Sequence, residues 1–118
     1  MLLLVKVFYN KVLLYFVVPS APPENVTSWN TSSTSLMVAW APVPTLLVHG
    51  LVRGYIVSYC KATGQRWCYT NTTTTDLHVQ LNNLEKFTLY FVRVLAFNQK
   101  GRGPSSNNLT VSTAEDGK

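Results

Sequence analysis

Cys60 and Cys68 are the residues of this sequence whose spacing points most directly to a chemical bond. They flank a short stretch between two segments that alternate as strands do, which predicts a hairpin with its turn near Gly64. In a hairpin symmetric about Gly64 the two cysteines would lie directly opposite, with Cβ atoms about 4.5 to 5.5 Å apart. We therefore expect a disulfide, and two free thiols in a reducing compartment are the alternative.

The two histidines, His49 and His78, do not indicate a metal site with the cysteines, nor do they indicate an enzyme active site. Together with Cys60 and Cys68 they lack the paired ligand spacing of structural zinc sites. No nucleophile elbow presents a serine to a base, and the Gly-Arg-Gly run precedes a strand and not a helix, so it is no phosphate cradle. We predict a non-catalytic protein without a cofactor.

Four glycosylation sequons favour a secreted protein, in which a disulfide would persist. Because the chain is rich in Asn, Ser and Thr, one or two sequons would arise by chance. The expected acceptors are Asn25, Asn30, Asn71 and Asn108.

The formal net charge is +5, but Lys6 and Lys11 belong to an apolar N-terminal segment that differs from the rest. Without them eight basic residues face five acidic ones. Nucleic-acid-binding proteins usually gather their basic residues on one face, whereas these are scattered. We therefore expect no nucleic-acid partner, while acidic partners such as sulfated glycans stay compatible with the charge.

The 118 residues suffice for one domain, and the segment 1–18 lies outside it in our interpretation. This leader is apolar at fifteen of eighteen positions but is interrupted by Lys6, Asn10 and Lys11. Its uncharged runs are far shorter than the ~20 residues of a membrane-spanning helix. It is either a signal peptide or a truncated or mispredicted start.

After the leader, short alternating segments are separated by turn residues, and no segment has a convincing helical period. This pattern is typical of an antiparallel sandwich. The expected strands cover residues 24–29, 35–40, 54–61, 67–71, 76–81, 87–98 and 107–113.

Several motifs, in order, resemble the fibronectin type III domain. They are PSAPPENV, SLMVAW followed by proline, GYIVSY, LNNLEKFTLY and VLAFNQKGRGPSS. The resemblance implies an all-β, immunoglobulin-like, seven-stranded antiparallel β-sandwich over residues 19–116, with residues 117–118 as a linker remnant. It also implies that Tyr90 is a tyrosine-corner residue whose hydroxyl bonds the backbone just upstream. The Trp-Ser-x-Trp-Ser motif of the cytokine-receptor relatives is missing.

Side chains two apart in a strand share a face, which predicts the core between the two sheets. The principal core residues are Trp40, Tyr55, Val57, Tyr59, Leu84, Tyr90, Val92, Val94 and Ala96. We expect them to be joined by Val26, Leu36, Val38, Leu77, Val79 and Leu81.

Two regions are candidate partner-binding surfaces. The first is the outward face of two neighbouring strands, which would form an exposed apolar patch unless the leader, another module or the arginine's aliphatic stem covers it. It would consist of Phe91, Arg93, Leu95 and Phe97, beside Ile56, Ser58 and Cys60. The second is the turn that carries Lys100 and Arg102, with His49 and Arg53 expected near the same end.

The fibronectin resemblance implies a non-catalytic extracellular interaction or spacer module in an adhesion, matrix or receptor-type protein. Its neighbours in the chain would be modules of the same kind, and its partner an unidentified cell-surface or matrix protein. One alternative is an intracellular muscle-type array of such modules, and another is binding of sulfated glycans through Lys100 and Arg102. Integrin binding through an Arg-Gly-Asp turn is not supported, because no aspartate follows Arg102 and Gly103.

Overall fold

The computed structural model describes residues 17–63 and 68–115 of the chain. The predicted leader therefore lies outside the described residues except for Val17 and Val18. The same holds for the expected linker remnant at residues 117–118 and for Trp67, where we expected the fourth strand to begin.

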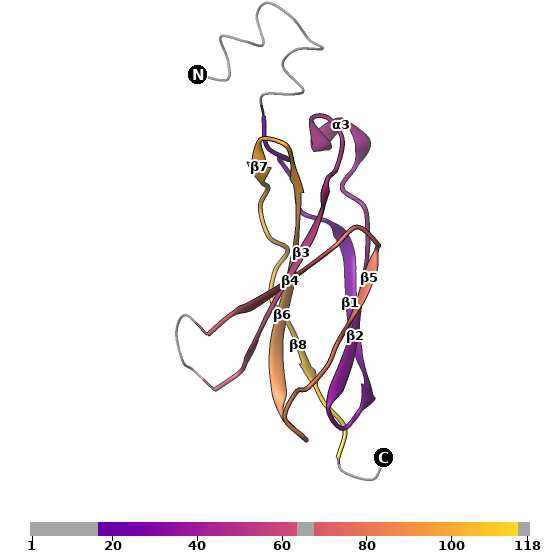
Figure 1. The fold of residues 1–118 in the computed structure, drawn as a ribbon, viewed down its shortest axis with the longest axis vertical. Helices are drawn as coiled ribbons and strands as arrows, with labels where there is room; N and C mark the ends of the chain where they lie inside the picture. Colours follow the sequence, from indigo (N-terminus) through magenta and orange to yellow (C-terminus); the bar gives the residue numbers. More distant parts are fainter. Residues whose placement is uncertain (1–16, 64–67, 116–118) are drawn as a thin grey trace, which may run out of the picture.

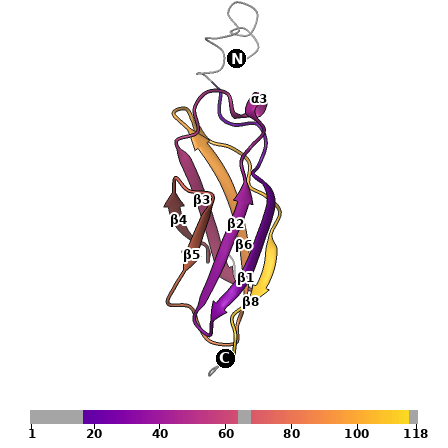
Figure 2. The ribbon, with the colours of Figure 1, turned by 90° about the vertical axis from the view of Figure 1, so that its right-hand side faces the viewer.

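In the described residues, eight strands form two antiparallel sheets, and α3 (Thr45–Val48) is a single helical turn between β2 and β3. The strands are β1 (Glu24–Ser32), β2 (Ser35–Ala41), β3 (Gly54–Lys61), β4 (Thr70–Thr74), β5 (His78–Leu81), β6 (Leu89–Asn98), β7 (Gly101–Arg102) and β8 (Leu109–Ser112). The smaller sheet has the order β1-β2-β5, and the larger has the order β4-β3-β6-β7, with β8 also paired to β6. Figures 1 and 2 show the two layers from two directions, with α3 at the same end as the β6–β7 turn. The expected immunoglobulin-like sandwich is confirmed.

The register between β3 and β6 places one alternating set of apolar residues from both strands on the inner face. Tyr55 pairs with Ala96, and Val57 pairs with Val94. Since side chains alternate across a strand, these positions share one face of the sheet. That face closes on β2, where Trp40 is buried and its ring centroid lies 5.4 Å from that of Tyr55. Burial raises the pKa of the Tyr55 hydroxyl.

The predicted core residues gather in one buried cluster. Of the nine principal ones, Tyr59 is half-buried against the cluster and the other eight are buried, namely Trp40, Tyr55, Val57, Leu84, Tyr90, Val92, Val94 and Ala96. Leu36, Val38 and Leu81 are also buried, and Val26 and Val79 pack at the margin. Leu77 was wrongly placed in the core: it is 41% exposed. Its ladder begins one residue later, at His78, so the strand alternation does not reach it.

The described residues contain eight strands where seven were expected. The last predicted strand, residues 107–113, contains β8, and the additional strand is β7, which was not predicted. Both pair with β6, and the connection between them also follows β6: the Gly103 amide donates to the Ala96 carbonyl over 2.8 Å and the Ser106 amide to the Val94 carbonyl over 2.8 Å. Between these two bonds the connection advances by three residues, from Gly103 to Ser106, while β6 advances by two, from Ala96 to Val94. Such a mismatch is typical of a β-bulge. Pro104 lies within this stretch and has no N–H to continue a ladder.

Two further expectations about local structure were wrong. The fourth strand is Thr70–Thr74 and not residues 67–71, because a run of threonines has β propensity without an apolar alternation that would mark its bounds. The helical turn α3 was not expected, since four residues are too few to show a helical period.

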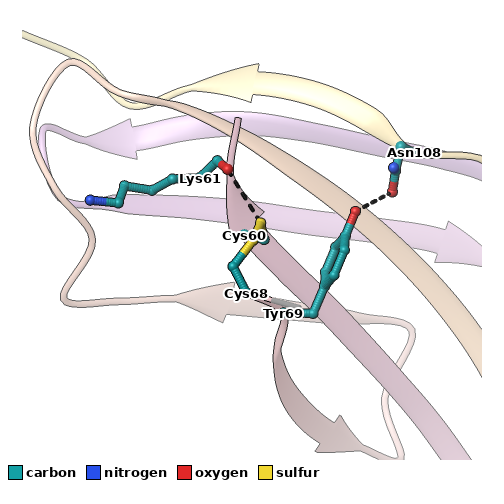
Figure 3. Close-up of a disulfide and its surroundings, with 5 residues drawn as sticks. All are labelled: Cys60, Lys61, Cys68, Tyr69 and Asn108. Atoms are coloured by element: carbon teal, nitrogen blue, oxygen red, sulfur yellow. Dashed lines mark hydrogen bonds between the residues drawn. A yellow bond between two sulfur atoms is a disulfide. The ribbon is translucent and has the colours of Figure 1, made fainter. Parts of the chain in front are cut away.

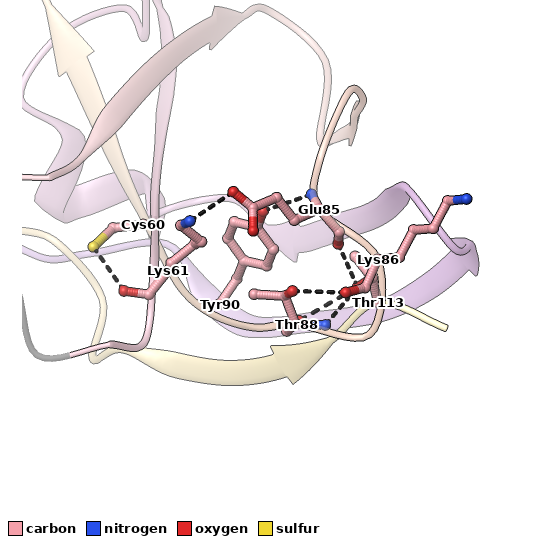
Figure 4. A network of polar contacts seen from close by, with 7 residues as sticks. All are labelled: Cys60, Lys61, Glu85, Lys86, Thr88, Tyr90 and Thr113. Atoms are coloured by element: carbon pink, nitrogen blue, oxygen red, sulfur yellow. Dashed lines mark hydrogen bonds and ion pairs between the residues drawn. The ribbon is translucent and has the colours of Figure 1, made fainter. Parts of the chain in front are cut away.

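The tyrosine corner ties the start of β6 to the connection before it. The Glu85 amide donates to the Tyr90 hydroxyl over 2.9 Å, so the expected backbone bond is present. Thr113 binds the same connection: its hydroxyl donates to the Glu85 carbonyl over 2.8 Å and accepts from the Thr88 amide over 2.9 Å (Figure 4). Together these bonds satisfy backbone groups that no sheet ladder reaches.

The corner also carries a surface ion pair. Lys61 Nζ lies 2.6 Å from Glu85 Oε2 (Figure 4), and this hydrogen bond raises the pKa of Lys61. Both side chains are well exposed to solvent, so the pair contributes little to stability.

Changing Tyr90 to Phe should lower the free energy of unfolding by about 1 to 2 kcal/mol, because the part-buried Glu85 amide loses its acceptor while the ring stays. Urea denaturation of both proteins measures the difference. The matched control is Tyr59→Phe, since the Tyr59 hydroxyl makes no hydrogen bond to the described residues and should cost much less. Equal losses in the two variants would contradict the role given to the corner.

Candidate interaction site

One end of the sandwich brings together three segments that are distant in the sequence. They are residues 17–20, the β2–β3 connection (residues 42–53) with α3, and the β6–β7 turn (residues 98–101). We call this region the loop end. It lies at the top of Figure 1.

Asn98 holds the three segments of the loop end together. Its side chain is buried, and Nδ2 lies 2.7 Å from the Val17 carbonyl, 3.1 Å from the Val48 carbonyl and 3.0 Å from the His49 carbonyl. Its Oδ1 accepts from the amides of Lys100 over 2.8 Å and Gly101 over 3.3 Å. One amide side chain thus satisfies backbone groups from all three segments.

His49 caps the C-terminal end of α3 in a left-handed backbone conformation, with φ of 60°. Its Nε2 lies 2.9 Å from the Ser20 hydroxyl, which links the connection to the N-terminal segment. Its Nδ1 is buried and has no hydrogen-bond partner among the described residues. A buried imidazole nitrogen without a partner is costly, so it is a point where an incoming group would gain free energy.

The basic residues predicted for this end do lie there. The Arg53 amide donates to the Phe97 carbonyl over 2.8 Å, and Phe97 pairs with Arg102 across the β6–β7 ladder. Arg53, Lys100 and Arg102 are all exposed. Between the connection and the turn is a hollow of about 210 Å³, lined by His49, Gly50, Leu51, Arg53, Asn98 and Gln99.

The expected apolar patch on the outer face of β3 and β6 is largely covered, which corrects the first candidate surface. Leu95 and Ile56 are 8% and 7% exposed, and Ser58 and Cys60 are also buried. Neighbouring side chains of the same sheet provide cover: the Phe97 ring lies over Gly54, where an added Cβ would stand 2.9 Å from it.

What this face offers a partner is a stacked arginine. The Arg93 guanidinium lies 4.0 Å from the centroid of the Tyr69 ring, and Arg93 and Phe91 are both half-buried. The Tyr69 hydroxyl donates to Asn108 Oδ1 over 3.1 Å (Figure 3). The face is therefore polar around Arg93 and does not present a continuous apolar surface.

Cys60 and Cys68 are joined in a disulfide beside this stack (Figure 3), with their Cα atoms 5.5 Å apart. They are not directly opposite, as a hairpin symmetric about Gly64 would require. The ladder ends with Tyr59 paired to Thr70, a register that would set Cys60 against Tyr69. The Cα separation nevertheless lies within the range that a disulfide spans.

The four sequon asparagines all lie on exposed positions of strands or loops. Two are held through their oxygen atoms: Asn71 Oδ1 accepts from the Ser58 hydroxyl over 2.6 Å, and Asn108 Oδ1 from Tyr69. Asn30 instead donates Nδ2, the atom that would carry a glycan, to the Ser112 carbonyl over 3.3 Å. Asn25 has a φ of 52° at an irregularity of the β1–β2 ladder.

The described residues contain no cluster of three or more His, Cys, Asp or Glu side chains that could hold a metal ion. In the same part of the chain, no helix has the length and apolar character needed to cross a membrane. His78 is exposed on the smaller sheet, far along the sequence from His49.

The roles of Asn98 and of the exposed leucines in the β2–β3 connection were not predicted from the sequence. An asparagine directly before a glycine-containing turn commonly accepts hydrogen bonds from the backbone amides that follow it. The bonds that Asn98 Oδ1 accepts from the Lys100 and Gly101 amides could therefore have been predicted from the sequence. The bonds from its Nδ2 to Val17, Val48 and His49 link residues at least 49 positions apart, and no local pattern reports them.

A profile of the fibronectin type III domain matches residues 21–112. Among relatives, the mouse cell adhesion molecule DSCAML1 is 39% identical over 101 residues, and chicken protein sidekick-1 is 43% identical over 103 residues. Each alignment covers 84% of this chain and 5% of the relative, so the chain spans a small part of their length.

Solved structures show the same fold. The third fibronectin III domain of human KIAA0343 protein aligns with a TM-score of 0.74 and 28% identity, covering 86% of this chain and 87% of that domain. The FN1–FN3 domains of chicken CNTN1 align with a TM-score of 0.74 and 27% identity, covering 82% of this chain and 32% of that one.

Changing Asn98 to Ala should lower the free energy of unfolding by about 2 to 3 kcal/mol, because buried carbonyl and amide groups lose their partners. Hydrogen exchange of the Lys100 and Gly101 amides should also accelerate, since both now donate to Asn98. The control is Asn107→Ala, at an exposed position. Unchanged exchange at the turn in Asn98→Ala would show that other contacts hold the loop end.

Proposed function

The chain belongs to the fibronectin type III family, and we propose that it acts as an extracellular, protein-binding module of a cell-adhesion protein. The domain is a non-catalytic module of the adhesion type. The observation that carries the proposal is the 37–43% identity to cell adhesion molecules and sidekick-1 over 84% of the chain. The names of DSCAML1 and DSCAM say adhesion, and the transfer of that role to this chain is our inference.

An oxidising, secretory environment is supported by two features of the larger sheet. The Cys60–Cys68 disulfide closes the β3–β4 hairpin, and disulfides persist mainly in secreted or cell-surface proteins. Asn71 and Asn108 are exposed sequon residues whose Oδ1 atoms are already bonded, which leaves their Nδ2 atoms outside those two bonds. We therefore propose these two as the glycosylated positions, ahead of Asn30, whose Nδ2 is engaged.

A place among neighbouring modules is supported by the shape of the domain. The described chain enters at the loop end, where Val17 is bound by Asn98, and leaves beyond β8 at the opposite end (Figure 1). Domains whose two ends lie at opposite poles can be joined end to end in a tandem array. The relatives, of which this chain spans 5%, have ample length for such an arrangement.

Two alternative functions make different predictions for this chain. An intracellular muscle-type array would keep Cys60 and Cys68 reduced and the sequons empty. A sulfated-glycan-binding module would use the exposed Lys100 and Arg102 and would release its ligand steeply as salt rises. The exposure of both residues is the observation that favours the second alternative.

In material secreted from animal cells, we expect Cys60 and Cys68 to be joined and glycans to be present on Asn71 and Asn108. Non-reducing peptide mapping by mass spectrometry, with and without glycosidase treatment, measures both. Asn30→Gln is the matched control, since removal of that sequon should change the glycan mass less than Asn71→Gln or Asn108→Gln. Free thiols together with bare asparagines would support the intracellular alternative and contradict ours.

Beads coated with the full secreted chain should bind cells or one another more than beads coated with an unrelated secreted protein of similar charge. The binding should survive enzymatic removal of cell-surface heparan sulfate, because we propose a protein partner. It should also survive the double change Lys100→Ala and Arg102→Ala with at most a modest loss, since exposed charges contribute little each. Loss of binding in both treatments would favour the glycan alternative.

A further inference from the structure

Exposed leucines are concentrated at the loop end. Leu46 is 86% exposed and Leu51 79%, and Leu47 and Val18 beside them are 39% and 36% exposed. We call Leu46, Leu47 and Leu51 the leucine rim. Single exposed apolar residues are ordinary, but three in one connection of a sandwich are a feature typical of contact sites.

The leucine rim is held in place by backbone bonds. Within the connection, the Leu47 amide donates to the Pro44 carbonyl over 2.8 Å, and the Ser20 amide donates to the Leu47 carbonyl over 2.9 Å. Val48 is buried in the core, and Asn98 binds its carbonyl. A partner would therefore meet Leu46 and Leu47 on a backbone that is already ordered, which reduces the entropy cost of binding.

The hollow beside the rim contains groups suited to a carboxylate. His49 contributes the buried Nδ1 that has no partner among the described residues. Arg53 is exposed, and within the described ranges its guanidinium makes no ion pair with a carboxylate. Asn98, although it lines the hollow, has its amide group engaged by the backbone and has a positioning role.

The hydrogen bond between Ser20 and His49 influences which imidazole nitrogen carries the proton. The Ser20 hydroxyl has one hydrogen and lies 2.9 Å from Nε2 and 3.4 Å from the Leu47 carbonyl. The shorter contact favours donation to Nε2, which places the proton of the neutral ring on Nδ1. That N–H is a donor, as is the Arg53 guanidinium, and both match an acceptor-only group such as a carboxylate. Apolar side chains on the rim would exclude water and strengthen such a contact.

We propose that the hollow and the leucine rim form a docking site for a protein segment that carries a carboxylate between apolar side chains. The carboxylate binds Arg53 and His49, and the flanking apolar side chains pack on Leu46 and Leu51. Charge complementarity selects the acidic group, and the leucines select a protein segment over a sulfated glycan, which has no apolar side chains to cover them. The inference rests on the proposed binding function and names the surface that performs it.

The test uses the full chain labelled with ¹⁵N and two peptide probes, acetyl-Leu-Glu-Leu-amide and acetyl-Leu-Gln-Leu-amide. Titration with the glutamate peptide should shift the amide signals of residues 46–53 and 98–101. It should bind up to about fivefold more tightly than the glutamine peptide, as expected for one exposed ion pair. Equal affinities, or shifts elsewhere on the sandwich, would overturn the proposal.

Variants separate the two parts of the site. Arg53→Gln should reduce the glutamate peptide to the affinity of the glutamine peptide, whereas Leu46→Ser with Leu51→Ser should weaken both. Arg102→Gln is the matched control: it removes a cation from the same end without lining the hollow, and affinity should stay within about twofold. A loss with Arg102→Gln as large as with Arg53→Gln would show a nonspecific charge effect and overturn the site.

A heparin tetrasaccharide provides the last arm. It should compete weakly with the glutamate peptide, and displacement of the peptide at equal concentration would overturn the choice of a protein segment. Failure of the peptide titration while coated beads still bind cells would reject this site alone. Failure of both would reject the binding function as well.

Discussion

The antiparallel register of β3 on β6 is the constraint on which the rest of this structure depends. It sets Tyr55 against Ala96 and Val57 against Val94, so that one face of the larger sheet becomes the inner wall of the sandwich. A slip by one residue would turn these side chains to solvent and bring Ile56 and Leu95 inward. Trp40 of the smaller sheet closes on that wall. The outer face is then left for the disulfide, the Arg93–Tyr69 stack and two sequons.

Function in such a fold depends on the loops and outer faces that the two sheets position. The space between the sheets is filled by buried side chains. At the loop end, Asn98 stands where β6 ends, and its amide converts three separate segments into one surface. The resulting hollow has a different chemistry from the outer sheet face: Leu51, a cation and the unpaired imidazole nitrogen of His49 line the hollow, whereas the outer face carries asparagines and a stacked cation. One domain therefore offers two unlike surfaces, and glycans on Asn71 and Asn108 would screen the second.

Much of the fold was predictable because the alternation of apolar residues is itself the instruction for a half-buried strand. The bounds of β3 agree with expectation, and β1, β2 and β6 were expected with near bounds. Prediction failed where that signal was weak. The threonine run of β4 has no apolar alternation to mark its bounds, Leu77 is apolar but lies outside the ladder, and the two-residue strand β7 was not predicted. In each case backbone pairing decided what the side-chain pattern could not report.

The candidate site, like the fold, was predicted from the sequence only in part. The residue order alone indicated a fibronectin-type sandwich with its basic residues Arg53, Lys100 and Arg102 near one end, since periodicity and turn residues are local properties. Only the tertiary structure decided that Leu95 and Ile56 are covered, that His49 meets Ser20, and that Asn98 joins Val17 to Val48. These facts depend on which distant segments come into contact, and contact between distant segments is set by packing of the whole chain, which no short window of sequence contains.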